Sequence, residues 1–270
     1  MEYNVYEPKS SLSGKVKCYW SLEDSENKDQ NKKDRVFPDG CVELLFHYGD
    51  FFKKYEDNGT SEIQPKSFVY GQITKFIDLE PTGRIGIFSV RFQPNGLQNF
   101  IDVKVSDLTD RIISLKDLWG NEGKMLETQM LSAANNEERL TIIERFLESQ
   151  QRPITEKDIQ IEKCVTAIME SNGIISIEKL IEEFQISKRH LERSFISNVG
   201  VSLKFFSRII RFNYALQLIN DKDFSSFTNV ALDGGFYDQA HFIKDFKEIT
   251  GLNPKQYFCE NLEMVKFFNL

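Results

Sequence analysis

The chain has 270 residues, of which 40% are hydrophobic and 28% charged, and its 41 acidic against 34 basic side chains give a net charge of −7 at pH 7. The length fits one large domain or two ordinary ones, and the 23 phenylalanines suffice for packed cores. The acidic balance excludes a chain that is basic throughout, as many DNA-binding proteins are, so any DNA-binding surface has to be a local patch.

The first 118 residues alternate short strand-forming runs with turn signals. The clearest runs are residues 16–20, 41–48, 67–70 and 85–92, and turns such as Pro38-Asp-Gly40 separate them. Many short strands at this spacing predict an antiparallel sandwich or small barrel. The polar segment 50–63 is predicted to be a loop or an exposed hairpin.

Helical patterning begins near Leu115. Residues 124–133 and 137–150 are predicted to form two amphipathic helices, because apolar residues recur on one face of each. Residues 151–156 are the predicted linker, since Pro153 ends the preceding helix.

The remaining chain is helical in pattern throughout. We therefore predict a multidomain α+β protein, with a β-rich barrel or sandwich and two following helices over residues 1–150. An all-α domain of two helix-turn-helix subdomains joined by a long helix is predicted for residues 155–260. Residues 261–270 are expected to be a C-terminal tail.

The helix-turn-helix pattern occurs twice in this C-terminal part. The first copy places helices at 177–184 and from Ser187, the second at 227–232 and from Asp238, and a long helix at about 203–220 joins them. Two such units on one chain can reach two successive major-groove faces without dimerising.

Capping residues mark where these helices begin. Four polar residues stand at expected N-cap positions, namely Ser187, Ser202, Asp238 and Asn253. The buried faces of the two reading helices are predicted to carry the apolar residues Leu191, Phe195, Phe242, Phe246 and Ile249.

Basic charge is concentrated in one stretch of the helical part. Between residues 187 and 211, six basic side chains stand against the single acid Glu192: Lys188, Arg189, Arg193, Lys204, Arg208 and Arg211. Screening over about 10 Å makes distant acidic residues matter little, so this local excess is enough to attract phosphates.

The segment from about Ile161 to Phe258 resembles the DNA-binding domain of the AraC/XylS family of bacterial transcriptional regulators. The motifs that carry this resemblance are Ser187-x-x-x-Leu191-x-Arg193-x-Phe195, Val230-Ala231-x-x-x-Gly235-Phe236, Gln239-x-x-Phe242-x-x-x-Phe246-Lys247 and Gly251-x-x-Pro254-x-x-Tyr257. The resemblance implies two helix-turn-helix subdomains joined by a long helix and a sequence-specific DNA-binding function. Residues 36–45, 91–96 and 108–120 look like the β-rich sensor domain of a subset of these regulators, which implies effector binding or dimerisation.

The outward faces of the two reading helices are predicted to meet base edges. The candidate base-reading residues are Arg189, Glu192 and Arg193 on the first helix and Gln239, His241 and Lys244 on the second. An arginine can bond guanine bidentately, and a glutamate can accept from a cytosine amino group. Ala240 or Ile243 could touch a thymine methyl. The alternatives are a solvated charged face and a second unit that only holds the DNA backbone.

Phosphate contacts are predicted along the same stretch. The candidates are Lys188, Ser202, Lys204, Arg208 and Arg211. Lys204, Arg208 and Arg211 share one face of the long helix at spacings of four and three, and the amides after Ser202 offer a helix N-terminus. The alternative is that these side chains pack, or form salt bridges, within the protein.

Candidate ligand-binding residues in the N-terminal half are aromatic. Trp20, Phe46, Tyr70, Phe88 and Phe92 are predicted to line an effector pocket, although such residues are more often ordinary core.

Cys41, Glu43 and His47 fall on one strand face and could mimic a cysteine nucleophile with a base. No third orienting group accompanies them.

The cysteines and histidines show no metal-site spacing. The cysteines are Cys18, Cys41, Cys164 and Cys259, and the histidines are His47, His190 and His241. No signal peptide or apolar run of membrane length is recognisable. We therefore expect a cytoplasmic protein with reduced thiols, no metal, no cofactor and no membrane contact.

The sequence thus predicts a DNA-binding transcription regulator, not an enzyme, controlled by a small effector in the N-terminal domain. Two alternatives stay open: a constitutive regulator with an N-terminal dimerisation module, and an N-terminal enzyme fused to a DNA-targeting domain. The expected partners are double-stranded DNA and a small effector, with RNA polymerase and a second copy of the chain as further candidates.

Overall fold

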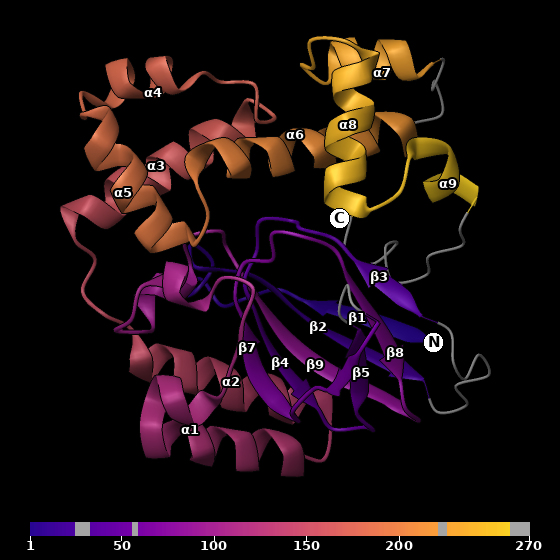
Figure 1. Cartoon of the computed structure of the whole chain (residues 1–270). Coiled ribbons are helices and arrows are strands. Elements are labelled where there is room, and N and C mark those ends of the chain that lie inside the picture. Colours follow the sequence, from indigo (N-terminus) through magenta and orange to yellow (C-terminus); the bar gives the residue numbers. More distant parts are fainter. Residues whose placement is uncertain (25–32, 56–58, 221–225, 260–270) are drawn as a thin grey trace.

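The computed structural model describes residues 1–24, 33–55, 59–220 and 226–259, and the predicted tail at 261–270 lies outside them. A β-rich N-terminal part carries a helical C-terminal part on one edge of its sheets (Figure 1). The strands are β1 (Glu2–Tyr6), β2 (Val16–Asp24), β3 (Asp34–Val36), β4 (Glu43–His47), β5 (Phe52–Tyr55), β6 (Ser61–Ile63), β7 (Ser67–Tyr70), β8 (Ile77–Pro81), β9 (Ile85–Phe92) and β10 (Ile112–Ile113).

The strands form two antiparallel sheets. One has the order β1-β2-β9-β4-β7-β10 and the other the order β3-β8-β5-β6. Apolar side chains from both sheets meet between them, including Trp20, Phe52 and Leu79. The predicted sandwich is therefore confirmed, and the described strands do not close into a barrel. β5 pairs with β6, so the predicted exposed hairpin is also present.

Residue alternation divides the six-stranded sheet into two faces. On β4, Leu44 and Phe46 join the large core, whereas Leu45 lies with the cluster between the sheets. β9 shows the same division between its even and odd positions. Both faces of β9 are buried, which is why its eight residues are almost continuously apolar.

Two helices cover the outer face of this sheet. They are α1 (Leu115–Ser132) and α2 (Asn136–Gln150), and their apolar residues complete the large core. α1 starts earlier than the predicted residue 124, because Ser114 caps it by accepting from the Asp117 amide at 3.1 Å. Gly120 interrupts it with a φ of 58°, so α1 consists of two helical runs joined at a kink.

The C-terminal part consists of helices throughout its described residues. They are α3 (Glu156–Glu170), α4 (Ile177–Phe184), α5 (Lys188–Val199), α6 (Leu203–Asn220), α7 (Phe227–Asp233), α8 (Gln239–Thr250) and α9 (Pro254–Cys259). The predicted N-caps are confirmed, since the side-chain oxygens of Ser187, Ser202, Asp238 and Asn253 each accept a bond from a backbone amide three residues later. The two helix-turn-helix units and the long helix between them are therefore present.

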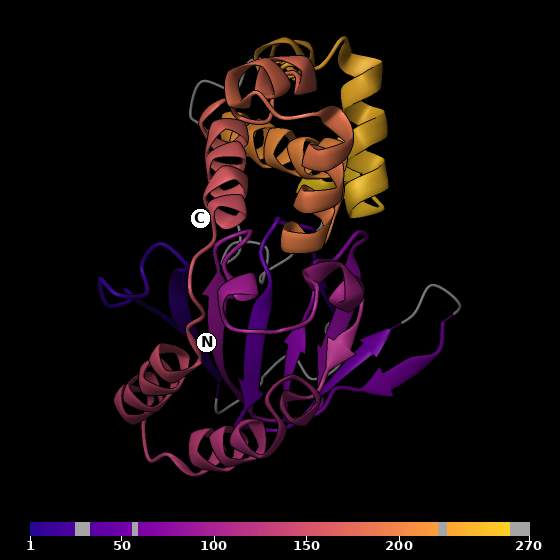
Figure 2. The ribbon, with the colours of Figure 1, turned by 90° about the vertical axis from the view of Figure 1, so that its left-hand side faces the viewer.

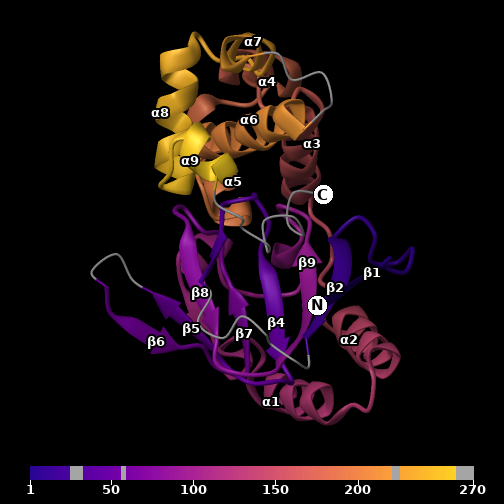
Figure 3. The ribbon, with the colours of Figure 1, turned by 90° about the vertical axis from the view of Figure 1, so that its right-hand side faces the viewer.

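Each helix-turn-helix unit has its own core. Leu191, Phe195 and Phe206 belong to the core of the first unit, and Phe242 and Phe246 to that of the second. α6 contributes to both cores, so it holds the two units together as one body. Figure 2 and Figure 3 show this helical body above the sheets from two opposite sides.

The end of α5 is docked on the sheet domain. The Thr109 hydroxyl donates to the carbonyl of Gly200, the left-handed residue that ends α5, at 2.6 Å. Nearby, Gly40 has a φ of 83°, and a Cβ there would lie 2.8 Å from the Phe206 ring on α6. The Gln72 amide fixes this turn by donating to the Gly40 carbonyl at 2.7 Å.

The end of α8 is docked in the same way. The Arg35 guanidinium donates to the Thr250 carbonyl at 3.1 Å, and it lies 3.9 Å above the Phe76 ring. Gly251, the left-handed residue that ends α8, packs so tightly that an added Cβ would lie 2.3 Å from Phe76. Both reading helices thus rest on the sheet domain by their C-terminal ends.

One sheet-domain residue enters the helical core itself. Phe37, which follows β3, belongs to the core cluster of the second helix-turn-helix unit. Its ring centroid lies 5.7 Å from that of Tyr257 on α9. The loop between β3 and β4 is therefore shared by the two domains.

None of the described helices is long and apolar enough to cross a membrane.

Candidate nucleic-acid interface and ligand cavity

The first reading helix, α5, presents its polar side chains outward. Ser187 caps the helix by accepting from the His190 amide at 3.4 Å. Leu191 points into the core, so the three predicted base-reading residues all lie exposed on the opposite face: Arg189, Glu192 and Arg193. The structure therefore gathers these three candidates on one accessible surface.

The second reading helix, α8, can be compared with α5 from its cap. Arg189, Glu192 and Arg193 stand two, five and six residues after the cap Ser187. The same offsets from Asp238 give Ala240, Ile243 and Lys244. The outward face of α8 is therefore more apolar than that of α5. Of the three base-reading residues predicted on α8, only Lys244 stands at one of these positions.

His241 and Gln239 of the predicted set make contacts inside the second unit. The His241 ring packs edge-on against Phe236, with centroids 5.6 Å apart, and its Nε2 lies 3.7 Å from Asp245. Gln239 is exposed but accepts from the Thr228 hydroxyl of α7 at 2.8 Å. These contacts hold α8 against the turn, which favours a structural part for His241.

Three of the predicted phosphate contacts are accessible. Lys188, Ser202 and Lys204 are exposed at the start of α5 and of α6. Ser202 also accepts from the Phe205 amide at 3.2 Å, so its hydroxyl caps α6.

Arg208 and Arg211 differ from the prediction, because both point into the helical body. Arg208 bonds both oxygens of Asp245 at 3.0 and 3.2 Å and also pairs with Glu248, which ties α6 to α8. Arg211 donates to the Gly235 carbonyl at 3.3 Å. The salt-bridging alternative therefore describes Arg208, and we remove both arginines from the phosphate-contact set.

Sequence reasoning missed one exposed aromatic residue at the second unit. Tyr237, directly before the cap Asp238, is 88% exposed. Tyr237 lies in the turn between α7 and α8, outside the apolar pattern of either helix. This position could have indicated an exposed aromatic side chain. Its position beside the N-terminus of α8 places a hydroxyl at the edge of the candidate interface.

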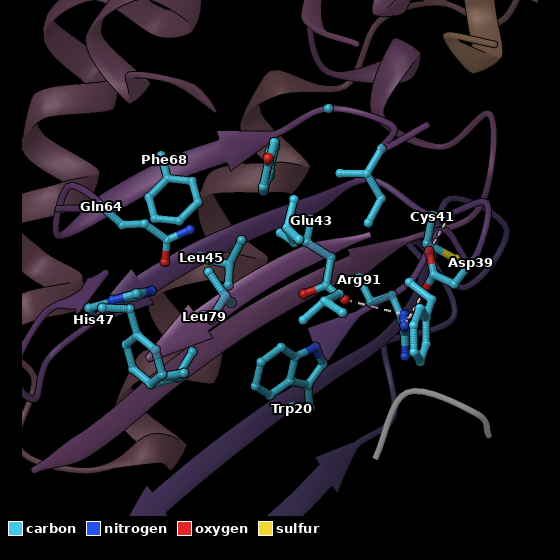
Figure 4. Close-up of a pocket in the computed structure, with 18 residues that line it drawn as sticks. Trp20, Asp39, Cys41, Glu43, Leu45, His47, Gln64, Phe68, Leu79 and Arg91 are labelled. Atoms are coloured by element: carbon cyan, nitrogen blue, oxygen red, sulfur yellow. Dashed lines mark hydrogen bonds and ion pairs between the residues drawn. The ribbon is translucent and has the colours of Figure 1, made fainter. Parts of the chain in front are cut away.

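A second candidate site is a cavity of about 70 Å³ between the two sheets. Successive rows of residues on paired strands form its floor. In one row Arg91 faces Cys18 and Glu43, and in the next Ser89 faces Trp20 and Leu45. Figure 4 shows the charged residues gathered at one end and His47, Gln64 and Phe68 at the other.

The charged end of the cavity holds two acids around one arginine. Arg91 pairs with Asp39 and, at 3.3 Å, with Glu43. Glu43 also accepts from the Ser89 hydroxyl at 2.7 Å. Burial raises the pKa of Glu43, and the Arg91 charge acts against this rise. The Arg91 side chain is only 4% exposed, whereas Asp39 and Glu43 keep 21% and 14%.

Cys41 and His47, predicted to share a strand face with Glu43, line the cavity together with it. Burial raises the pKa of Cys41 to about 12, so its thiol holds its proton. Burial lowers the pKa of His47 to about 4, so its imidazole is neutral at pH 7. These environments favour binding over nucleophilic chemistry, because they suppress the thiolate that a cysteine nucleophile needs.

The predicted effector-pocket residues divide between the two sheet faces. Trp20 and Tyr70 line the cavity. Phe46, Phe88 and Phe92 do not, because they occupy the alternate strand positions and point into the core beneath α1 and α2. These three residues lie in the ordinary core, which is the alternative given for them in the sequence analysis.

Cavity residues that the sequence did not single out include Asp39, Leu45, Phe52, Phe68, Leu79 and Arg91. Strand alternation from Glu43 would have pointed to Leu45. Asp39 and Phe52 lie outside β4, and only the tertiary fold brings them to the cavity.

Two family models match parts of the chain. Residues 4–114 match a domain of unknown function (DUF6597), and residues 180–259 match a helix-turn-helix domain. Each match covers less than half of the chain. Together they fall on the sheet domain and on the two helix-turn-helix units.

Curated relatives resemble the C-terminal part. An uncharacterized HTH-type transcriptional regulator of Staphylococcus aureus is 34% identical over 83 residues, which is 31% of this chain and 11% of that protein. The HTH-type transcriptional activator RhaR of an Enterobacter species is 27% identical over 117 residues, 43% of this chain and 41% of RhaR. The matched part thus spans well under two thirds of either relative.

Two solved structures also align with this chain. ToxT from Vibrio cholerae aligns over 96% of this chain and 97% of its own, with a TM-score of 0.47 and 13% identity. The AraC-like transcriptional activator CuxR aligns over 81% of this chain and 87% of its own, with a TM-score of 0.29 and 13% identity.

Proposed function

Because the C-terminal part of this chain is a helix-turn-helix domain of the AraC type, we propose that the protein is a transcription regulator that binds specific DNA sequences through α5 and α8. We further propose that a small molecule bound between the two sheets controls this binding. The exposed Arg189, Glu192 and Arg193 on a helix whose other face is buried are the observation that carries the DNA-binding proposal.

The proposed domain boundaries follow the packing. We propose a regulatory domain of residues 1–150, whose two C-terminal helices complete the large core. The proposed DNA-binding domain of residues 155–260 begins one residue before α3. A bacterial regulator of this kind acts in the cytoplasm, and its further partners would be RNA polymerase and a second copy of the chain.

The proposed base contacts differ between the two reading helices. Arg189, Glu192 and Arg193 have the charges and donors to distinguish guanine and cytosine edges. On α8 the equivalent positions carry Ala240, Ile243 and Lys244. An alanine and an isoleucine suit thymine methyl groups, so we assign α8 a weaker preference for A·T pairs than α5 has for its own site.

The proposed phosphate contacts surround these faces. Lys188 and Lys204 supply charge on either side of α5, and the N-terminal amides of α6 supply donors beyond Ser202. We add Tyr237, whose exposed hydroxyl stands beside the N-terminus of α8.

The length of α6 sets the spacing of the two reading helices. α6 has 18 residues and is therefore about 27 Å long at about 1.5 Å per residue. Such a length can hold two readers roughly one DNA turn, about 34 Å, apart on one face of the duplex. One copy of the chain should therefore contact two short segments about 10 base pairs apart.

The proposed control by a small molecule rests on a shared wall. Phe37, Asp39 and Cys41 line the cavity, and they lie on the loop between β3 and β4. In the same loop Gly40 packs on Phe206 of α6, and Phe37 itself belongs to the core around Tyr257. A ligand that displaces this loop therefore changes the support of both helix-turn-helix units.

The DNA-binding proposal is tested by selecting preferred sequences from random duplexes with the full chain. Affinity for the selected site should fall by about 10²-fold or more between 50 and 200 mM salt if several phosphates are neutralised. Arg189→Ala should cost about 1–3 kcal/mol on that site and relax the preference at one base pair. The matched control is Arg145→Ala, which removes an exposed arginine from α2. Failure to enrich any sequence, or equal losses in both variants, would reject the proposal.

A further inference from the structure

The cavity between the sheets changes character along its length. Rows two residues apart on β4 place Glu43 at one end, Leu45 in the middle and His47 at the other. Four residues of extended strand span about 13 Å. With a volume of only about 70 Å³, the cavity is a narrow slot rather than a round chamber.

The middle of the slot is apolar and aromatic. Its walls there are formed by Trp20, Leu45, Tyr70 and Leu79, and Phe68 continues the apolar wall to the far end. Such walls favour a narrow hydrocarbon or ring, and aromatic faces also attract cations.

The charged end carries more negative than positive charge. Glu43 and Asp39 share Arg91 as their common partner, and no other basic side chain lines the cavity among the described residues. Lys17 is exposed and borders a neighbouring cleft together with Asp39 and Cys41, and its charge acts on Cys41. Glu43 therefore faces the apolar slot, and it shares the single positive charge of Arg91 with Asp39.

The far end adds a hydrogen-bonding atom without a charge. His47 is 1% exposed, and its Nδ1 has no hydrogen-bond partner in the part of the chain that the structure describes. A buried ring nitrogen without a partner is costly. Because the imidazole is neutral at pH 7, it does not offset the acids.

An anionic guest fits this arrangement poorly. A carboxylate placed at the charged end would lie against Glu43 and Asp39, while the guanidinium that could bind it is 4% exposed and already paired. A cation there would meet two partly accessible carboxylates, and in a site removed from water such charge-assisted bonds are strong.

We propose that this cavity binds a narrow hydrophobic amine, with its ammonium group at Glu43 and Asp39 and its apolar body along Trp20, Leu45 and Phe68. The binding of an amine does not depend on the proposed function, but its effect on DNA binding does. Asp39 lies in the loop between β3 and β4, and the next residue, Gly40, packs on Phe206 of α6. An ammonium group at Asp39 therefore acts directly on the contact between the two domains.

The test compares three probes of one shape on the full chain. Hexylamine, hexan-1-ol and hexanoate are titrated by calorimetry at pH 7.5, where an alkylamine is protonated because its pKa is near 10. We expect hexylamine to bind at least about 10-fold more tightly than hexan-1-ol, and hexanoate to bind most weakly. Hexanoate binding as tightly as hexylamine, or no binding by any probe, would overturn the proposal.

Glu43→Gln isolates the charge, because it keeps the shape and removes one carboxylate. The preference for hexylamine over hexan-1-ol should then shrink about 10-fold, whereas it should stay intact in the control Glu137→Gln on the exposed face of α2. If Glu43→Gln fails to fold by circular dichroism, Asp39→Asn makes the same test. An unchanged preference in a folded variant rejects the assignment.

The same samples separate this inference from the proposed function. DNA affinity is measured for each with and without hexylamine. Amine binding with unchanged DNA affinity would keep the ligand class and reject effector control. Normal DNA binding by a chain that binds no hexylamine would reject the amine as ligand and leave the DNA-binding proposal standing.

Discussion

Removing the Arg208 guanidinium should destabilise the helical domain without altering how the protein neutralises DNA phosphates. In the structure Arg208 bonds both oxygens of Asp245, whose side chain is only 6% exposed, and also pairs with Glu248. Arg208→Ala leaves the Asp245 carboxylate buried without its bidentate partner, while His241 lies 3.7 Å away and the Arg211 charge also acts on Asp245. Breaking a buried pair in this way costs about 3–5 kcal/mol.

This loss is large beside the total stability of a domain, about 5–15 kcal/mol. Urea denaturation of the full chain, followed by circular dichroism, should show an earlier transition for the helical signal. The double variant Arg208→Gln/Asp245→Asn should recover much of the loss, since it removes the uncompensated charge.

Lys204→Ala is the matched control on the same helix. Lys204 is exposed, so its removal should change stability by less than about 0.5 kcal/mol. It should instead lower the slope of log affinity against log salt by about 0.9, the value for one lost phosphate contact. If Arg208→Ala behaves like Lys204→Ala in both measurements, Arg208 binds phosphate and the internal pairing is wrong.

Three further outcomes are expected. Inserting five base pairs between the two contacted DNA segments should rotate one segment to the far side of the duplex, so its protection in a footprint should be lost. Undiminished protection would mean that only one of the two helices, α5 or α8, reads the DNA. His47 has a pKa of about 4 when folded, below its ordinary value of 6.5, so its contribution to stability is complete above pH 6.5 and is lost as pH falls toward about 4. Between pH 6.5 and about 4, the free energy of unfolding of His47→Gln should therefore fall by about 3 kcal/mol less than that of the unaltered chain, as measured by urea titrations. Parallel curves of unfolding free energy against pH would contradict the burial argument. Leu191→Asp should unfold the first unit, at several kcal/mol, as seen by lost helical signal, and a folded variant would invert the faces of α5.

Local features were predictable from the sequence. The caps Ser187 and Asp238 and the apolar spacing of Leu191 and Phe195 depend on residues within one or two helical turns, so pattern alone located α5 and α8. The exposed face of α5 followed from the same spacing. Strand alternation likewise placed Glu43 and His47 on one face of β4.

What the sequence could not give depends on which elements meet. Phe46 and Leu45 are both apolar, and alternation does not say which of them faces the second sheet. Arg208 shares a face with Lys204, but only the packing of α8 on α6 shows that Asp245 reaches it. The equivalence of Ala240 with Arg189 was within reach of the sequence, because both caps were predicted, but the outward set predicted for α8 did not use them.

The placing of Phe37 in the core of the second helix-turn-helix unit has a consequence for synthesis. Phe37 precedes Leu203, the first residue of α6, by 166 positions. At about 5–20 residues per second, the ribosome needs roughly 8–33 s to make that stretch, during which the ring has no helices to pack on. The loop between β3 and β4 therefore stands without its partner helices until the C-terminal part has been made. When the last helices emerge, they pack around a side chain that was made within the first seventh of the chain.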